Sequence, residues 1–235
     1  MDKERRGTSK APDILVKKGV NVHVSEDFEG TQESITSAAL EAYESGEKVI
    51  AVGGDHSITY GMIRAFRQAY PDSCLIILDA HSDCEDDFIP PSHEGVTRAI
   101  ASTLMPPEDI LLIGYRKART KEEKEFLKDN NVKVFKHFDE ETIVDATEFL
   151  EKYPAGYLSI DIDVFDPKDA PGTGWPESHG PKKRTVLNLI RTLTKNKKLK
   201  SVDLVEVSPK KSDKKTAPLA TEILSEILHE FSPKG

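Results

Sequence analysis

The stretch GYLSIDID (156–163) is a short apolar run that ends in alternating carboxylates, and it shows the pattern on which the chain is built. A continuous apolar run of this length, bounded by polar residues, is typical of a strand buried on both faces of a parallel sheet. Runs of the same character lie at KVIAV (48–52), CLIILDA (74–80), DILLIGY (109–115), VKVFK (132–136) and SVDLVEV (201–207). The sequence therefore predicts a mostly parallel sheet.

Segments with helical periodicity separate these runs. They lie at residues 31–45, 58–69, 120–130, 139–152 and 184–195, and a last one follows at 216–231. Strands that alternate with helices predict an α/β fold of three layers, α/β/α, with helices on both faces of a mostly parallel central sheet. Because the chain has 235 residues and no linker of low complexity, we expect a single domain, residues 1–235.

Charge and composition exclude several classes of function. The formal net charge of -8 argues against a protein that binds nucleic acid or an anionic membrane, and the Lys-rich runs at 195–200 and 210–215 are interpreted as solvated loop charge. No apolar run approaches the roughly 20 residues of a membrane span, and MDKERRGTSK lacks the apolar core of a signal peptide. Only two cysteines occur, Cys74 and Cys84. We expect a cytoplasmic protein that binds neither nucleic acid nor membrane.

Three of the predicted strands end in residues of unusual chemistry. KVIAV runs into GGDHS (53–57), CLIIL into DAHSD (79–83), and GYLSI into DID (161–163). Ligands of open α/β sheets bind just beyond the carboxyl ends of the strands, so these residues are the first candidates for a site. The candidate metal ligands are His56, Asp79, His81, Asp83, Asp161 and Asp163.

The spacing of these residues suggests that they converge. Side chains alternate along an extended segment, so the acids and the histidine of DAHSD (79–83) are expected on one side, and Asp161 and Asp163 repeat this spacing. Each motif alone also fits a helix cap, a structural ion pair or, for His56, a buried histidine. Four carboxylates in one cleft without cations would repel one another prohibitively. We therefore expect bound divalent metal.

Charge and ligand type suggest the number and the identity of the ions. Two divalent cations balance four aspartates and leave one bridging hydroxide as the surplus anion. A set of ligands that is rich in carboxylates and lacks thiolates favours manganese over zinc, although zinc, cobalt and nickel remain compatible. Two imidazoles disfavour magnesium.

The motifs resemble those of the ureohydrolase family of arginases and agmatinases, and most closely its agmatinase-like members. The resemblance rests on GGDHS (53–57), DAHSD (79–83) and SIDIDVFDPKDAPGTGWP (159–176). It is supported by RGTSKAPDIL (6–15), IGYR (113–116), VEVSP (205–209) and TAPLATEIL (216–224), and it covers most of the chain. The resemblance implies an arginase-like fold with the metal site at the carboxyl ends of the strands.

The resemblance also implies two Mn²⁺ ions per subunit and divides the ligands between them. One ion would be held by His56, Asp79, Asp83 and Asp161, and the other by Asp79, His81, Asp161 and Asp163, so that Asp79 and Asp161 bridge. Metal ions about 3.5–4 Å apart supply a hydroxide nucleophile near neutral pH.

The same resemblance implies roles in catalysis and substrate binding for His93, Glu206 and the ligand Asp83. His93 would move protons to the leaving amine, Asp83 would help to stabilise the tetrahedral intermediate, and Glu206 would bind the planar guanidinium of the substrate. Asp55 would hold the ligands in place. Without the resemblance, His93 also fits a surface loop and Glu206 a structural ion pair.

The substrate is suggested by the loop CEDDFIPP (84–91), whose acids repel a carboxylate and attract an amine. Together with the agmatinase-like motif SHEGVTR (92–98), the loop favours hydrolysis of agmatine to putrescine and urea, a step of polyamine biosynthesis. A merely solvated acidic turn is an equally good interpretation of the loop. Arginase, guanidinobutyrase and formiminoglutamase activities therefore stay open.

Some positions depart from the family pattern. Trp175 stands where a small threonine is common, Glu177 to Gly180 replace a glycine-rich continuation, and the chain begins near RGT (6–8) without the usual preceding strand. Trp175 could line a pocket or pack internally, and His179 is expected to be exposed.

Two other hypotheses about the function remain open: a non-catalytic family member that binds metal or a ligand, and a metal hydrolase of acyl-amide bonds. As partners we expect a small guanidinium substrate and further copies of the chain, as trimers or hexamers.

Overall fold

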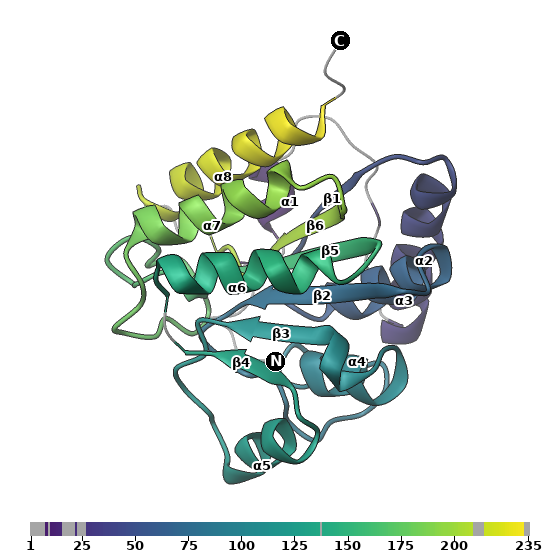
Figure 1. Cartoon of the computed structure of the whole chain (residues 1–235), viewed down its shortest axis with the longest axis horizontal. Helices are drawn as coiled ribbons and strands as arrows, with labels where there is room; N and C mark the ends of the chain where they lie inside the picture. The colour runs from purple at the N-terminus through teal and green to yellow at the C-terminus, as the bar shows by residue number, and fades with distance from the viewer. Residues whose placement is uncertain are drawn as a thin grey trace.

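Six parallel strands form the sheet at the centre of the computed structural model, which describes residues 8, 10–15, 22, 27–136, 138–208 and 214–232 (Figure 1). The strand order is β1-β6-β5-β2-β3-β4, and every neighbouring pair is parallel. The strands are β1 (Val49–Val52), β2 (Ser73–Leu78), β3 (Ile110–Ile113), β4 (Lys133–Phe135), β5 (Ala155–Asp161) and β6 (Leu199–Val205). The predicted mostly parallel sheet is therefore confirmed. Parts of four segments quoted above lie outside the described residues: MDKERRGTSK (1–10), RGTSKAPDIL (6–15), VEVSP (205–209) and the Lys-rich run 210–215.

Helices cover both faces of this sheet, as the three-layer prediction requires. One buried apolar cluster joins the sheet to α1, α6, α7 and α8, and a second joins it to α2, α3, α4 and α5. In Figure 1, α6 and α7 lie in front of the sheet and α3 lies behind it. The helices are α1 (Ala11–Leu15), α2 (Phe28–Glu44), α3 (Ile58–Ala69), α4 (Val96–Thr103), α5 (Lys121–Asp129), α6 (Glu140–Glu151), α7 (Lys183–Lys195) and α8 (Thr216–Phe231). None of these described helices is both long and apolar enough to cross a bilayer.

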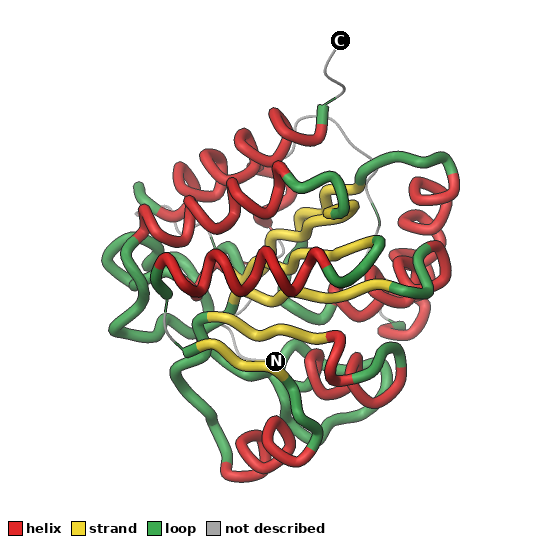
Figure 2. Tube along the Cα trace, viewed as in Figure 1, coloured by secondary structure: helices red, strands yellow, loops and turns green. Residues whose placement is uncertain are grey.

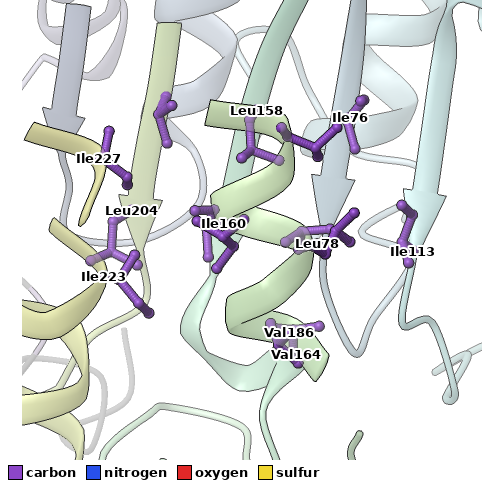
Figure 3. Close-up of a cluster of buried hydrophobic side chains, with 14 of the residues drawn as sticks. Ile76, Leu78, Ile113, Leu158, Ile160, Val164, Val186, Leu204, Ile223 and Ile227 are labelled. Carbon is purple, nitrogen blue, oxygen red and sulfur yellow. The ribbon is translucent and has the colours of Figure 1, made fainter. Parts of the chain in front are cut away.

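The alternation of side chains along β2 shows how one strand serves both layers. Cys74, Ile76 and Leu78 belong to the cluster under α6, α7 and α8, whereas Leu75 and Ile77 belong to the other cluster. Figure 3 shows the first cluster, with strand side chains such as those of Ile76 and Leu78 beside those from the helices. A strand buried on both faces needs apolar residues at every position, and this explains the continuous apolar runs of the sequence.

The predicted helices are confirmed to within a few residues, and two of them begin with a clear start signal. A capping box of Thr120 and Glu123 begins α5, and Asp139 with Thr142 forms the corresponding box at α6. The sequence analysis missed α4, which is short and has Gly95 at its N-cap without a capping side chain. Its first turn is instead held by the carbonyl oxygen of Asp83, in the segment that precedes it. Figure 2, in the same view as Figure 1, shows the strands in yellow at the centre with helices in red around them.

Truncation of a buried core side chain is expected to lower the stability of the protein. Ile160 is fully buried in the central strand β5, so Ile160→Ala should lower the free energy of unfolding by about 2–5 kcal/mol. The control Val144→Ala removes a side chain that is 56% exposed and should leave the stability nearly unchanged. Urea unfolding of both variants measures the difference, and equal midpoints would contradict this description of the core.

Candidate metal centre

The six predicted metal ligands lie together at the carboxyl edge of the sheet. They come from the turn after β1, the loop after β2, the last residue of β5 and the 3₁₀ helix η3 (Ile162–Val164) that follows it. All are almost completely buried, with exposed fractions of 1–4%. We call this set the carboxylate–imidazole cluster: His56, Asp79, His81, Asp83, Asp161 and Asp163.

One half of the cluster surrounds the His56 imidazole. Its Nδ1 lies 3.1 Å from an Asp79 oxygen, 3.0 Å from an Asp83 oxygen and 3.6 Å from an Asp161 oxygen. One ligand-type atom from each of His56, Asp79 and Asp83 lies within 4.8 Å of the others, close enough to share one metal ion.

The other half of the cluster surrounds His81. Its Nδ1 lies 2.8 Å from an Asp163 oxygen and 3.7 Å from an Asp79 oxygen. Asp79, His81 and Asp163 form the second group of atoms within 4.8 Å of one another. Because Asp79 belongs to both groups, the geometry suits two adjacent cations that share one carboxylate.

The backbone that brings these side chains together is not the extended strand that the sequence analysis assumed. β2 ends at Leu78 and β5 at Asp161, so DAHSD (79–83) and Asp163 lie beyond the strands. Asp83 has a φ of 47°, in the left-handed region. The period-two explanation was therefore wrong, although the side chains do converge. Local bonds shape the turns instead, as when Asp79 Oδ1 accepts a hydrogen bond from the His81 N–H at 2.6 Å.

Asp83 is held from two sides by elements that the sequence analysis did not connect with it. Its carbonyl oxygen accepts the backbone N–H groups of Thr97 at 2.9 Å and Arg98 at 3.3 Å, in the first turn of α4. On the other side, the buried Glu123 carboxylate accepts a hydrogen bond from the Ser82 hydroxyl at 2.7 Å and from the Cys84 N–H at 3.2 Å. These contacts stabilise an unfavourable backbone angle exactly where a candidate ligand needs it.

Arg116, the arginine of IGYR, holds the second half of the cluster from outside. Its Nη2 donates to the carbonyl oxygens of Asp163 and Glu177, each at 2.9 Å, and its Nη1 donates to that of Val164 at 3.1 Å. One guanidinium thus joins η3 to the loop after GTGWP. IGYR was noted in the sequence only as a supporting motif, and its partners become visible only in three dimensions.

The pKa values show how strongly the acids of the cluster repel one another. Burial and the neighbouring carboxylates raise the pKa of Asp161 well above its usual value, and burial together with Asp79 raises those of Asp83 and Asp163. Burial lowers the pKa of His81, but Asp163 and Asp79 outweigh it and raise the value to about 11. The excess negative charge therefore favours the protonated form of the imidazoles. Divalent cations suit the same oxygen and nitrogen donors, so the residues fit a metal centre.

Glu206 lies beside the cluster, one residue past the end of β6, with a φ of 60°. Its Oε1 accepts the backbone N–H of His56 at 3.0 Å. Burial and the charge of Asp55 raise its pKa to about 8. Asp55 itself accepts a hydrogen bond from the Ser57 N–H at 3.2 Å, so it holds the turn that carries His56.

His93 is connected with the cluster through a chain of ionic contacts. Its Nε2 lies 3.8 Å from Glu94, Glu94 lies 3.0 Å from Arg119, and Arg119 lies 4.0 Å from Asp83. Arg119 also lies 5.8 Å from the ring centre of Trp175, which is 44% exposed. Trp175 is therefore not an internal packing residue. Like Trp175, His179 is exposed, as expected.

Two of the acids in the loop 84–91 already have partners. Asp87 accepts the backbone N–H groups of Phe88 at 2.8 Å and Ser92 at 3.0 Å, and Asp86 lies 3.0 Å from Arg98. Part of the acidic character of the loop thus serves its own conformation. Of these two acids, only Asp86 is paired with an arginine in the described part of the chain.

Comparison with known proteins agrees with this geometry. The family model described as "Arginase family" matches residues 3–229. An agmatinase of Bacillus subtilis (strain 168) is 33% identical over 192 residues, which is 80% of this chain and 65% of the relative. An arginase of Staphylococcus aureus (strain MRSA252) is 32% identical over 188 residues, which is 71% of this chain and 62% of the relative. The chain thus spans just under two thirds of the length of each.

A solved structure extends the match to the fold. The agmatine ureohydrolase of Thermoplasma volcanium superposes with a TM-score of 0.81 and 28% sequence identity, covering 96% of this chain and 84% of that chain. The ureohydrolase resemblance drawn from the motifs is therefore confirmed. By its motifs, its parallel sheet and its match over residues 3–229, the chain belongs to the arginase family.

Proposed function

We propose that the chain is a binuclear manganese hydrolase that cleaves a guanidinium C–N bond and releases urea, with agmatine as its first candidate substrate. The observation that carries the proposal is the sharing of Asp79 between two buried groups of ligand-type atoms, one around His56 and one around His81. The side chains around these two groups would hold the metal ions, bind the substrate and transfer protons, all within a single domain.

The carboxylate–imidazole cluster would hold two Mn²⁺ ions. His56, Asp79, Asp83 and Asp161 would bind one, and Asp79, His81, Asp161 and Asp163 the other. When bound, such a pair supplies a hydroxide near neutral pH and neutralises negative charge that develops in the reaction. The contact of 3.6 Å between Asp161 and His56 supports a place for Asp161 in the first group. Assembly into homo-oligomers belongs to the same proposal.

Glu206 would bind the guanidinium of the substrate. A carboxylate matches the planar fork of a guanidinium with two parallel hydrogen bonds, and one Glu206 oxygen is already fixed by the His56 N–H. A cationic substrate would also favour the ionised form of Glu206, whose pKa is raised to about 8 by burial and Asp55. Substrate binding and ionisation of Glu206 would thus support each other.

His93 would transfer a proton to the leaving amine, and Asp83 would help to stabilise the tetrahedral intermediate. His93 is only partly exposed, and its loop runs directly from Asp83 to α4. The His93 imidazole, which would donate this proton, lies 3.8 Å from Glu94. Glu94 would help to orient the imidazole.

The residues near the cluster carry charges of both signs that could recognise the end of the substrate away from its guanidinium. The agmatinase relatives and the acidic loop 84–91 support agmatine. Arg119, 4.0 Å from Asp83, supports instead a compound that carries a carboxylate, such as arginine, guanidinobutyrate or formiminoglutamate. The two possibilities differ in the far end of the substrate, which carries no carboxylate in agmatine and a carboxylate in the other compounds.

A substrate panel tests the proposal. Protein loaded with Mn²⁺ is expected to release urea from agmatine faster than from arginine or guanidinobutyrate, and faster than it releases formamide from formiminoglutamate. The reverse order would transfer the assignment to the carboxylate-bearing compounds. No product from any of them, with two metal ions bound, would favour a non-catalytic family member.

Removal of one ligand tests the metal centre. Asp163→Ala takes away the partner of His81 at 2.8 Å, so metal content and urea release should fall together. The matched control is Asp72→Ala, which changes an exposed aspartate at the amino end of β2. Metal analysis and rate assays measure both, and an unchanged rate with full metal content would eliminate this assignment of Asp163.

Replacement of Glu206 is expected to raise the stability of the metal-free protein and to lower its activity. Because folding raises its pKa from 4.5 to about 8, the metal-free protein should lose stability as the pH rises between these values. Glu206→Gln should abolish this loss, so its thermal midpoint should exceed that of the wild type by a margin that widens up to pH 8 and then stays constant. With substrate and Mn²⁺, kcat/KM should fall at least about 10-fold, since a hydrogen bond to a charged group contributes roughly 1.5–3 kcal/mol.

Thermal unfolding in a pH series and steady-state kinetics measure these effects. Glu44→Gln, at the exposed end of α2, serves as the control and should change neither quantity. Parallel stability curves for Glu206→Gln and the wild type would contradict the burial argument. An unchanged kcat/KM would contradict the binding role.

A further inference from the structure

A fully buried carboxylate lies next to the metal centre but takes no part in the function proposed above. Asp203 stands in the middle of β6 and is inaccessible to solvent. Its Oδ1 accepts the Ser159 hydroxyl at 2.7 Å, and its Oδ2 accepts the hydroxyls of Tyr157 at 2.7 Å and Thr59 at 2.8 Å. A buried acid is costly unless several donors satisfy it, and here they come from β5 and α3.

The hydrogen-bond directions in this network are fixed by the number of protons. Each hydroxyl has a single proton to donate, and Ser159 directs its own to Asp203. Ser159 Oγ also lies 3.0 Å from Nε2 of His56, where it can therefore only accept. Thr59 lies 3.4 Å from Ser159 but uses its proton on Asp203 as well, so it does not compete.

This direction determines which ring nitrogen of His56 keeps its proton when the other nitrogen binds metal. If Ser159 only accepts, Nε2 must donate, and Nδ1 is left to face the oxygens of Asp79 and Asp83. Metal ligation requires a lone pair on Nδ1. The network thus selects the tautomer that can bind metal.

We propose that Asp203 is a positioning residue, which acts through Ser159 to hold His56 in the tautomer that ligates metal through Nδ1. The inference rests on the metal centre proposed above and adds a determinant of its affinity. It concerns only one half of the cluster, because Nε2 of His81 faces a different acceptor, Glu177, at 3.5 Å. Burial and Asp203 also raise the pKa of Tyr157, which keeps this donor protonated.

The variant Asp203→Asn tests the proposal because an amide has one acceptor and one donor end. The carbonyl end is expected to stay with the two hydroxyls of Tyr157 and Thr59, which turns the NH₂ group toward Ser159. Ser159 then accepts from Asn and donates to His56 Nε2, which moves the ring proton to Nδ1. Mn²⁺ binding at the His56 half should weaken roughly 10–100-fold, while the other half is unchanged.

The experiment titrates Mn²⁺ alone into metal-free protein and follows free Mn²⁺ by electron paramagnetic resonance. The matched control is Tyr157→Phe, which removes one donor from the same carboxylate but leaves Ser159 in place, and both affinities should persist in it. Nitrogen chemical shifts of His56 in Zn²⁺-loaded protein report the tautomer directly. Protonated Nε2 is expected in the wild type and in the control.

A second variant keeps the test independent of folding defects in Asp203→Asn. Ser159→Ala deletes the connecting hydroxyl and should weaken the same half of the cluster, and Asp203→Asn in that background should add no further loss.

Three outcomes would overturn the inference. Equal Mn²⁺ affinities in Asp203→Asn and the wild type would reject the positioning role while the two-metal function stands. Equal weakening of both halves, reproduced by Tyr157→Phe, would reduce the network to a structural role. A wild-type protein that binds no divalent metal would reject the metal centre and this inference together.

Discussion

The crowding of four buried aspartates at one edge of the sheet is the constraint on which the rest of the site depends. At exposed fractions of 1–4%, solvent cannot screen their mutual repulsion, and burial together with this repulsion raises the pKa values of Asp83, Asp161 and Asp163. Such an arrangement is stable only if positive charge enters it. Without a metal ion, the surrounding acids raise the pKa values of His56 and His81 and so favour cationic imidazoles, and a divalent cation would replace the proton on Nδ1 of His56. The same constraint makes the cluster a place for divalent cations.

The surrounding fold is organised so that this unfavourable set can persist. Parallel strands end at a common edge, and their apolar side chains fix the edge from both faces. Glu123 and the first turn of α4 hold the backbone around Asp83, whereas Arg116 holds η3 and Asp163. Most of the candidate ligands therefore lie beyond the strands, but their segments are tied to neighbouring helices and strands. Preorganisation of this kind is what a site needs if metal binding is not to reorder the chain.

The two imidazoles of the cluster are supported in different ways. Behind His56 lies a closed network of hydroxyls that ends on a buried carboxylate, so its hydrogen bonds have fixed directions. Behind His81 lies Glu177, which is partly exposed and also contacts Lys117 at 2.6 Å. The first arrangement is fully buried, and the second reaches the surface at Glu177. Two halves of one cluster can thus differ in metal affinity although their ligand atoms are nearly alike.

The sequence by itself determined the layers, the six strands and most of the helices, and the six residues of the cluster. It could do so because burial imposes continuous apolar runs, and because chemistry at the ends of parallel strands must converge. It did not determine how the residues converge: the turns after β2 and β5 depend on positive φ at Asp83 and on η3, which no periodicity announces. Nor did it reveal α4, Glu123, Arg116 or Asp203 as parts of the site, since their partners are distant in the chain. Those contacts exist only once the sheet brings separate segments together, and the tertiary structure alone decided them.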